Sequence, residues 1–193
     1  MKNIKTINDL INKIKITGDI PGDVVSVLDS YGCPNTAIHS KAVAAEAGKL
    51  AEKFGANRQK SETAGWLHDI SAIIPNGHRI DAARERGIEV LAEEEIFPLI
   101  IHQKLSAEIA SCIFKIEDTE ILGAIGCHTT LKKDASDIDK IVFIADKIQW
   151  DQHGNPPYLN ELLEKLSISL DHGTFYFLDY LLQREPSLKV VHP

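Results

Sequence analysis

Cysteine is scarce in this chain, and the cysteines present are not arranged in pairs. Cys33, Cys112 and Cys127 are the three cysteines among 193 residues, and no two of them form a CxxC motif. An odd number of well-separated cysteines argues against a disulfide framework and against a structural zinc site made of thiolates. This pattern fits a reducing compartment, and we predict a cytoplasmic protein.

Basic clusters and long apolar segments are also absent. The formal net charge is −7 without any basic run, whereas surfaces for nucleic acid or anionic membranes need clustered positive charge. The apolar run at residues 141–145 is far too short to cross a bilayer, and residues 1–5 do not resemble a signal peptide. We therefore expect neither nucleic acid nor a membrane as partner, and an anionic substrate must be captured locally.

Strand-like alternation is missing as well, and helical periodicity takes its place. Apolar residues recur at helical spacing in many segments, most clearly over residues 39–54, 61–70, 102–116, 118–128 and 136–148. We predict an all-α bundle of about eight helices. Residues 1–35 are expected to form an N-terminal helical extension packed on the core of residues 36–193, whose last helices close a single compact domain.

Several ionisable residues stand in or beside these apolar stripes, where an unpaired ionisable group costs several kcal/mol. They are His39, His68, Asp69, His102, His128 and Asp146. Taken singly, His39 or His128 is better explained as a hydrogen-bonded core histidine, and Asp146 as a partner of a nearby cation. A buried metal centre explains the whole set together.

Imidazole nitrogens combined with carboxylate oxygens suit first-row transition metals such as iron or manganese. His39, His68, Asp69 and Asp146 would supply one metal, while His102 and His128 provide for a second. Asp69 can bridge the two metals because a carboxylate has two oxygens. Two metals about 3.5 to 4 Å apart can clamp a phosphate and generate hydroxide for in-line attack on phosphorus.

The order His, His-Asp, His, His, Asp resembles the HD-domain superfamily of metal-dependent phosphohydrolases. Within it, the chain is most similar to the YqeK family of symmetrical diadenosine tetraphosphate hydrolases. The segments that carry the resemblance are His39-Ser40 with Val43-Ala44, Leu67-His68-Asp69-Ile70, Ile101-His102, Cys127-His128-Thr129-Thr130 and Val142–Ile148. Together they span roughly residues 36 to 150.

The resemblance implies an HD-domain helical bundle with two metal ions, iron foremost, and cleavage of a dinucleoside polyphosphate into two nucleoside diphosphates. By position it implies that His39, His68, Asp69, His102, His128 and Asp146 are the metal ligands. Asp69 would be the bridging catalytic residue beside a metal-bound hydroxide.

The chain departs from the family pattern at positions on the substrate side. Ala72 stands where the family usually has a lysine, and Leu131 where it has a glycine. Residues 149–153 replace a Glu-Pro-x-Arg stretch, and Gln103 with Lys104 replaces small residues. These changes leave the implied metal ligands intact. The resemblance therefore supports the metal chemistry more strongly than it supports a particular substrate.

Candidates for contact with substrate follow the fourth histidine and Asp146: Thr129, Lys132, Lys133 and His153. The lysine pair is otherwise a solvated pair, and His153 otherwise a surface residue. Trp150 either packs between helices or stacks on a base. The arginines at 79, 84 and 86 contact phosphate only if their segment borders the site, and residues 93–95 are expected to be a solvated helix start.

The leading hypothesis is a metal-dependent phosphohydrolase that cleaves diadenosine tetraphosphate symmetrically to two ADP. One alternative is a nucleotidase or other phosphomonoesterase that uses the same centre. The other is a metal-bearing domain that senses a nucleotide without catalysis. A nucleotide or dinucleoside polyphosphate is the expected partner, and the sequence leaves a homodimer open.

Overall fold

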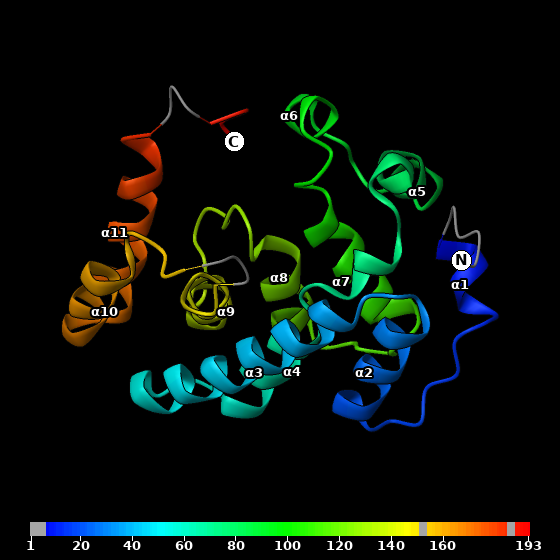
Figure 1. Cartoon of the computed structure of the whole chain (residues 1–193), viewed down its shortest axis with the longest axis horizontal. Helices are drawn as coiled ribbons and strands as arrows, with labels where there is room; N and C mark the ends of the chain where they lie inside the picture. Colours follow the sequence, from blue (N-terminus) through cyan, green and yellow to red (C-terminus); the bar gives the residue numbers. More distant parts are fainter. Residues whose placement is uncertain (1–6, 151–153, 185–187) are drawn as a thin grey trace.

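The computed structural model describes residues 7–150, 154–184 and 188–193, which form helices and turns without any strand (Figure 1). The α-helices are α1 (Ile7–Ile11), α2 (Ile20–Ser30), α3 (Pro34–Phe54), α4 (Arg58–Leu67), α5 (Arg79–Glu85), α6 (Ala92–Ile96), α7 (His102–Cys112), α8 (Thr119–Cys127), α9 (Asp137–Ile148), α10 (Leu159–Ile168) and α11 (Leu170–Leu182). Two short 3-10 helices, η1 (Ile70–Ile73) and η2 (Asn76–His78), connect α4 to α5. The predicted all-α class is confirmed.

The number and the boundaries of the helices differ from the predictions. The described residues contain eleven α-helices rather than about eight, since a helix such as α6 has five residues and gives little periodic signal. The first helix ends at Ile11 rather than near residue 16. α3 begins at Pro34 rather than at His39, because proline suits a first helical turn, whose N–H groups have no partner within the helix.

Buried apolar side chains form two clusters. The first lies among α1, α2, α4, α5, α7 and α8, where Ile7 and Leu10 of α1 are fully buried. The second joins α3 and α9 to α10 and α11, which lie together at one side of the molecule in Figure 1. α3 and α9 supply residues to both clusters. The division of the chain at residue 35 stays a prediction.

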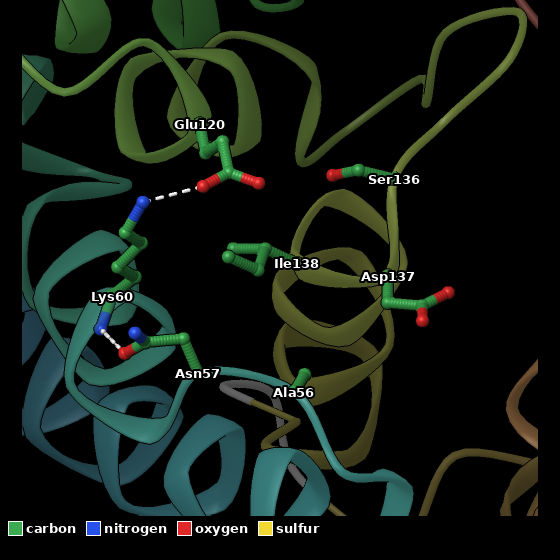
Figure 2. Close-up of a pocket in the computed structure, with 7 residues that line it drawn as sticks. All are labelled: Ala56, Asn57, Lys60, Glu120, Ser136, Asp137 and Ile138. Atoms are coloured by element: carbon green, nitrogen blue, oxygen red, sulfur yellow. Dashed lines mark hydrogen bonds and ion pairs between the residues drawn. The ribbon is translucent and has the colours of Figure 1, made fainter.

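Helices α4, α8 and α9 pack on one another and begin at the same place. Their N-caps are Asn57, Asp118 and Ser136, whose side chains accept hydrogen bonds from backbone N–H groups of the first turns. Asparagine, aspartate and serine are the side chains that N-cap positions prefer. The starts of these helices line a hollow of about 280 Å³, in which Lys60 bonds with Glu120 (Figure 2). None of the predicted site residues lines this hollow.

Helices α3 and α4 approach closely at Gly65. A Cβ atom at Gly65 would lie 2.7 Å from the Cα atom of Ala44, closer than such atoms approach in proteins. Glycine at this position therefore permits the packing that brings His39 of α3 beside His68 at the end of α4. Within the described ranges, no helix is both long and apolar enough to cross a membrane.

Candidate metal centre

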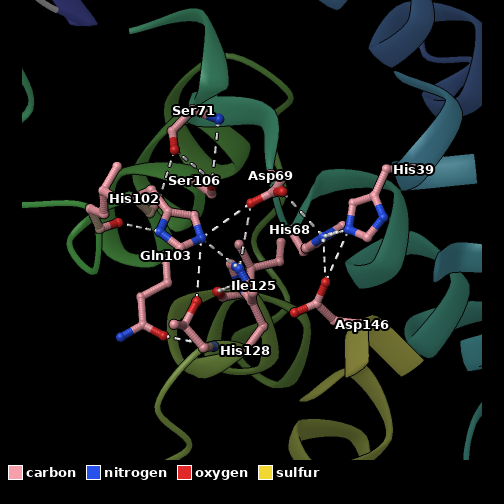
Figure 3. A network of polar contacts seen from close by, with 12 residues as sticks. His39, His68, Asp69, Ser71, His102, Gln103, Ser106, Ile125, His128 and Asp146 are labelled. Carbon is pink, nitrogen blue, oxygen red and sulfur yellow. Dashed lines mark hydrogen bonds and ion pairs between the residues drawn. The ribbon is translucent and has the colours of Figure 1, made fainter. Parts of the chain in front are cut away.

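All six predicted ligand residues come together at one site (Figure 3). His68 and His128 are the C-cap residues of α4 and α8, and Asp146 lies in the last turn of α9. Because these helices begin together at their capped N-termini, their C-terminal ends face the site. The partial negative charge at a helix C-terminus favours a bound cation.

Three of the histidines share one local arrangement. The Nδ1 atom of each ring lies within hydrogen-bond distance of the carbonyl oxygen three residues earlier: His68 with Gly65 at 2.8 Å, His102 with Leu99 at 2.5 Å and His128 with Ile125 at 2.8 Å. A carbonyl can only accept, so Nδ1 carries a proton, and in the uncharged ring Nε2 is left as the acceptor. Such a contact fixes both the tautomer and the orientation of a metal-binding histidine.

Asp69 lies between two groups of histidines. Its Oδ1 is 3.2 Å from Nε2 of His102 and 3.5 Å from Nε2 of His128. Its Oδ2 is 3.6 Å from Nε2 of His68. The two carboxylate oxygens therefore face different partners, as the predicted bridging role requires.

The second carboxylate, Asp146, completes the group around His68. Its Oδ1 is 3.0 Å from Nε2 of His39 and 3.6 Å from Nε2 of His68. Its Oδ2 is 2.5 Å from the ammonium of Lys147. Lys147 lies within the Val142–Ile148 segment that carries the resemblance, and its position next to Asp146 is the sequence signal that predicts a place at the site.

The two buried histidines titrate in opposite directions. Burial lowers the pKa of His68, but the negative charges of Asp69 and Asp146 outweigh this effect and raise the pKa to about 9. For His128, burial and the positive charge of His102 dominate over the contact with Asp69 and lower the pKa to about 4. At neutral pH, His128 therefore has an uncharged ring suited to binding a cation.

Both carboxylates are held in the ionised form. Burial by itself raises the pKa of Asp69, but the charge on His68 and further histidine contacts hold the pKa well below the ordinary value. Burial also raises the pKa of Asp146, but the charge of Lys147 and the hydrogen bond from His39 outweigh it and hold the pKa well below the ordinary value. Ionised carboxylates act only as acceptors, the state in which they coordinate metals.

The donors fit a metal centre. Nε2 of His102 is 2.9 Å from Nε2 of His128, and Nε2 of His39 is 3.3 Å from Nε2 of His68. Facing lone pairs repel at these distances unless a cation or proton lies between them. Two groups have donor atoms all within 4.8 Å of one another, namely His39, His68 and Asp146, and His68, Asp69 and His128. Imidazole and carboxylate together suit first-row transition metals.

Gln103 fixes the turn that follows His128. Its side chain is 1% exposed, accepts from the N–H groups of Thr129 and Thr130, and donates to the Thr130 hydroxyl at 2.9 Å. The Thr129 hydroxyl consequently lies 3.3 Å from Nε2 of His102, at the edge of the centre. In the sequence, Gln103 stands out only as a departure from the family pattern, because its role depends on a contact across 26 residues.

The structure also shows the conformation or position of Leu131 and Ala72, two other departures from the family pattern. Leu131 adopts the left-handed conformation with φ of 58°, where glycine is favoured, so the turn keeps a glycine-like backbone despite its side chain. Ala72 lies in η1 just beyond Asp69 and adds no charge there.

The predicted substrate contacts lie in different surroundings. Thr129 is at the centre, whereas the ammonium of Lys132 pairs with buried Asp139 at 2.9 Å and Lys133 is exposed. The prediction for His153 lies outside the described residues. A cavity of about 460 Å³ opens beside the centre, and its lining includes His39, Asp69, Gln149 and Trp150, together with exposed Ile38.

A family model described as the HD domain matches residues 36–151, which is more than half of the chain. The chain therefore belongs to the HD domain family. Membership of this family implies binding of divalent metal, and the six clustered residues all lie within the matched segment.

Individual relatives agree with this assignment. An uncharacterized protein in the pepC 5' region of Lactococcus lactis subsp. cremoris is 47% identical over 137 residues, covering 71% of this chain and 69% of the relative. A symmetrical bis(5'-nucleosyl)-tetraphosphatase of Staphylococcus aureus is 35% identical over 113 residues, covering 58% of this chain. The match spans 57% of that enzyme, less than two thirds of its length.

A solved structure from Clostridium acetobutylicum, described as a predicted HD superfamily hydrolase involved in NAD metabolism, has the same fold. The TM-score is 0.78 at 23% identity, covering 86% of this chain and 87% of the other. The predicted HD-domain helical bundle is confirmed. The predicted class of metal-dependent phosphohydrolase has the support of the family.

Proposed function

We propose that this protein hydrolyses diadenosine tetraphosphate symmetrically into two ADP at a centre of two transition-metal ions. The observation that carries the proposal is the position of Asp69, whose two oxygens face separate histidine groups. The relative from Staphylococcus aureus, named for this reaction, supports the choice of substrate. Iron is the proposed metal, and manganese would suit the same donors.

Each residue has a defined part in this proposal. His39, His68 and Asp146 would hold one metal, His102 and His128 would hold the other, and Asp69 would serve both. Metal ions held there would supply Lewis-acid chemistry, which lowers the pKa of a bound water molecule and polarises phosphate oxygens. The N–H groups at Nδ1 of three histidines stay bonded to backbone carbonyls and keep the rings oriented throughout.

Two features of the chain act on the substrate side. Thr129 offers a hydroxyl beside His102, and Gln103 holds that turn in place. The cavity at His39 and Asp69 is walled in part by Ile38 and Trp150, apolar surfaces suited to a nucleoside. Lys132, Lys133 and His153 remain proposed contacts for the polyphosphate chain.

Chromatography of the products tests this function directly. The protein as purified is incubated with diadenosine tetraphosphate, and two ADP per substrate are expected. Release of AMP with ATP would contradict symmetrical cleavage. Turnover of nucleoside monophosphates alone would move the function to a phosphomonoesterase. Nucleotide binding without hydrolysis of any compound in the panel would indicate a sensing domain.

A further inference from the structure

Arg79 is a buried arginine whose guanidinium has few hydrogen-bonding partners in the described part of the chain. It begins α5 and is 9% exposed. Its Nε donates to the carbonyl oxygen of Ile74 at 3.3 Å, which directs the side chain back towards η1, the turn that follows Asp69. In the described part of the chain, the guanidinium makes no other hydrogen bond or ion pair.

A guanidinium has five N–H donors and stays protonated at physiological pH. Nε is used by Ile74, and the two terminal amino groups of Arg79 have no hydrogen-bond partner among the described residues. Burying a cation without partners costs several kcal/mol, so an arginine in this state is suited to an anion that arrives with the substrate.

The surroundings of Arg79 connect it to the metal centre. Burial lowers the pKa of Arg79, while the charges of Asp69 and Cys33 act in the opposite direction, so both residues lie within electrostatic range. Cys33 in turn has its sulfur 3.5 Å from the carbonyl oxygen of Ala72. Arg79, Cys33 and Ala72 thus occupy one neighbourhood next to Asp69.

Position 72 is where the resemblance leads us to expect a lysine, and the alanine there supplies no charge. Arg79 comes from a different element but reaches the same neighbourhood. Arginine and phosphate form paired, charge-assisted hydrogen bonds, which makes a guanidinium an effective replacement for an ammonium.

We propose that Arg79 binds a phosphate oxygen of the substrate and supplies the positive charge that Ala72 lacks. This inference rests on the proposed phosphohydrolase function. Arg79 is assigned to binding a phosphate, and the metal ligands do not include it. Its removal should therefore weaken phosphate binding without removing metal.

The test uses Arg79→Met and Arg79→Lys in the metal-loaded protein, with Arg84→Met as the matched control. Arg84 lies on the same helix but is exposed and pairs with Glu95. For Arg79→Met, the affinity for ADP measured by calorimetry and kcat/KM for diadenosine tetraphosphate should both fall ~10- to 100-fold. Metal content should stay at the wild-type value, Arg79→Lys should keep part of the affinity, and Arg84→Met should change neither quantity.

A rescue experiment separates phosphate binding from a structural role. Adding Ala72→Lys to Arg79→Met should restore at least part of the ADP affinity, even if Arg79→Met alone is poorly folded. Unchanged ADP affinity and KM in a folded Arg79→Met protein would overturn the inference, and so would a failure of Ala72→Lys to restore binding. Absence of hydrolysis by the wild type would instead overturn the proposed function, and the calorimetric comparison would still decide the role of Arg79.

Discussion

At the scale of single residues, Glu94 is a fully buried carboxylate satisfied by three segments of the chain. Its Oε2 accepts from the N–H of Leu91 at 2.8 Å and from the ammonium of Lys104 at 2.9 Å. Its Oε1 is 3.3 Å from Nε2 of His192. The expectation of a solvated run at residues 93–95 is therefore wrong for Glu94.

Glu94→Gln should destabilise the protein by about 1 to 3 kcal/mol, because the Lys104 charge loses its buried partner. Burial raises the pKa of Glu94, but these hydrogen bonds outweigh it and lower the pKa below the ordinary value. A lowered folded-state pKa stabilises the fold above the unfolded pKa of about 4.3, and this stabilisation is lost as the pH falls. Urea unfolding between pH 7 and pH 3 measures both effects.

Glu93→Gln is the matched control, since Glu93 is only half-buried on the same short helix. Its unfolding free energy should match that of the wild type at every pH. Equal stabilities of Glu94→Gln and wild type at pH 7 would show that the buried carboxylate contributes nothing to the fold.

The sequence predicts the roles of residues that depend mainly on their neighbours along the chain. The six clustered residues and the caps Asp118 and Ser136 could be predicted because helical periodicity and capping are set by neighbours in sequence. Glu94 and Gln103 could not, since contacts with other elements decide their roles. Arg79 was a candidate for phosphate contact only on the condition that its segment borders the site. Glu94 is held by the ammonium of Lys104 and the backbone N–H of Leu91. Nothing in the run of three glutamates indicates which of them makes these contacts.

At the scale of secondary-structure elements, Gly65 serves two purposes on α4. Its missing side chain permits the close approach of α3, and its carbonyl oxygen accepts from Nδ1 of His68 at 2.8 Å. The packing of α3 on α4 and the orientation of a central histidine therefore depend on one residue. A single added methyl group should disturb both.

Gly65→Ala should destabilise the protein by about 1 to 3 kcal/mol through overpacking, and should also reduce metal content by shifting His68. Gly126→Ala on α8 is the control, because its Cβ would meet only the Cβ of Ala107 at an ordinary 3.7 Å. The control should be neutral or gain up to about 1 kcal/mol, as alanine favours helix. Thermal unfolding and metal analysis measure both variants; wild-type stability of Gly65→Ala would contradict the packing argument.

At the scale of the whole molecule, the metal centre joins both apolar clusters through α3, α4, α7, α8 and α9. A ligand that binds only the folded state stabilises it by RT ln(1 + [L]/Kd). Because the donors come from helices far apart in sequence, unfolding separates them and releases the metal. Metal binding and global stability should therefore be coupled.

Chelation should lower the melting temperature by roughly 6 to 12 °C, the shift expected for the loss of about 3 kcal/mol in a protein of this size. Differential scanning calorimetry with and without a chelator measures it. A double variant that combines His39→Ala with His128→Ala loses one donor from each of the two groups of metal ligands. Its melting temperature should be the same with and without the chelator. A wild type whose Tm is unchanged after confirmed loss of metal would exclude this coupling.

In the proposed centre Asp69 bridges two metal ions, and the metal content per chain of the wild type beside Asp69→Ala tests this role. We expect close to two metals per chain in the wild type, and in Asp69→Ala neither metal nor hydrolysis of diadenosine tetraphosphate. A wild type that binds no metal, or an Asp69→Ala protein that keeps both metals and full turnover, would show that Asp69 has no bridging role.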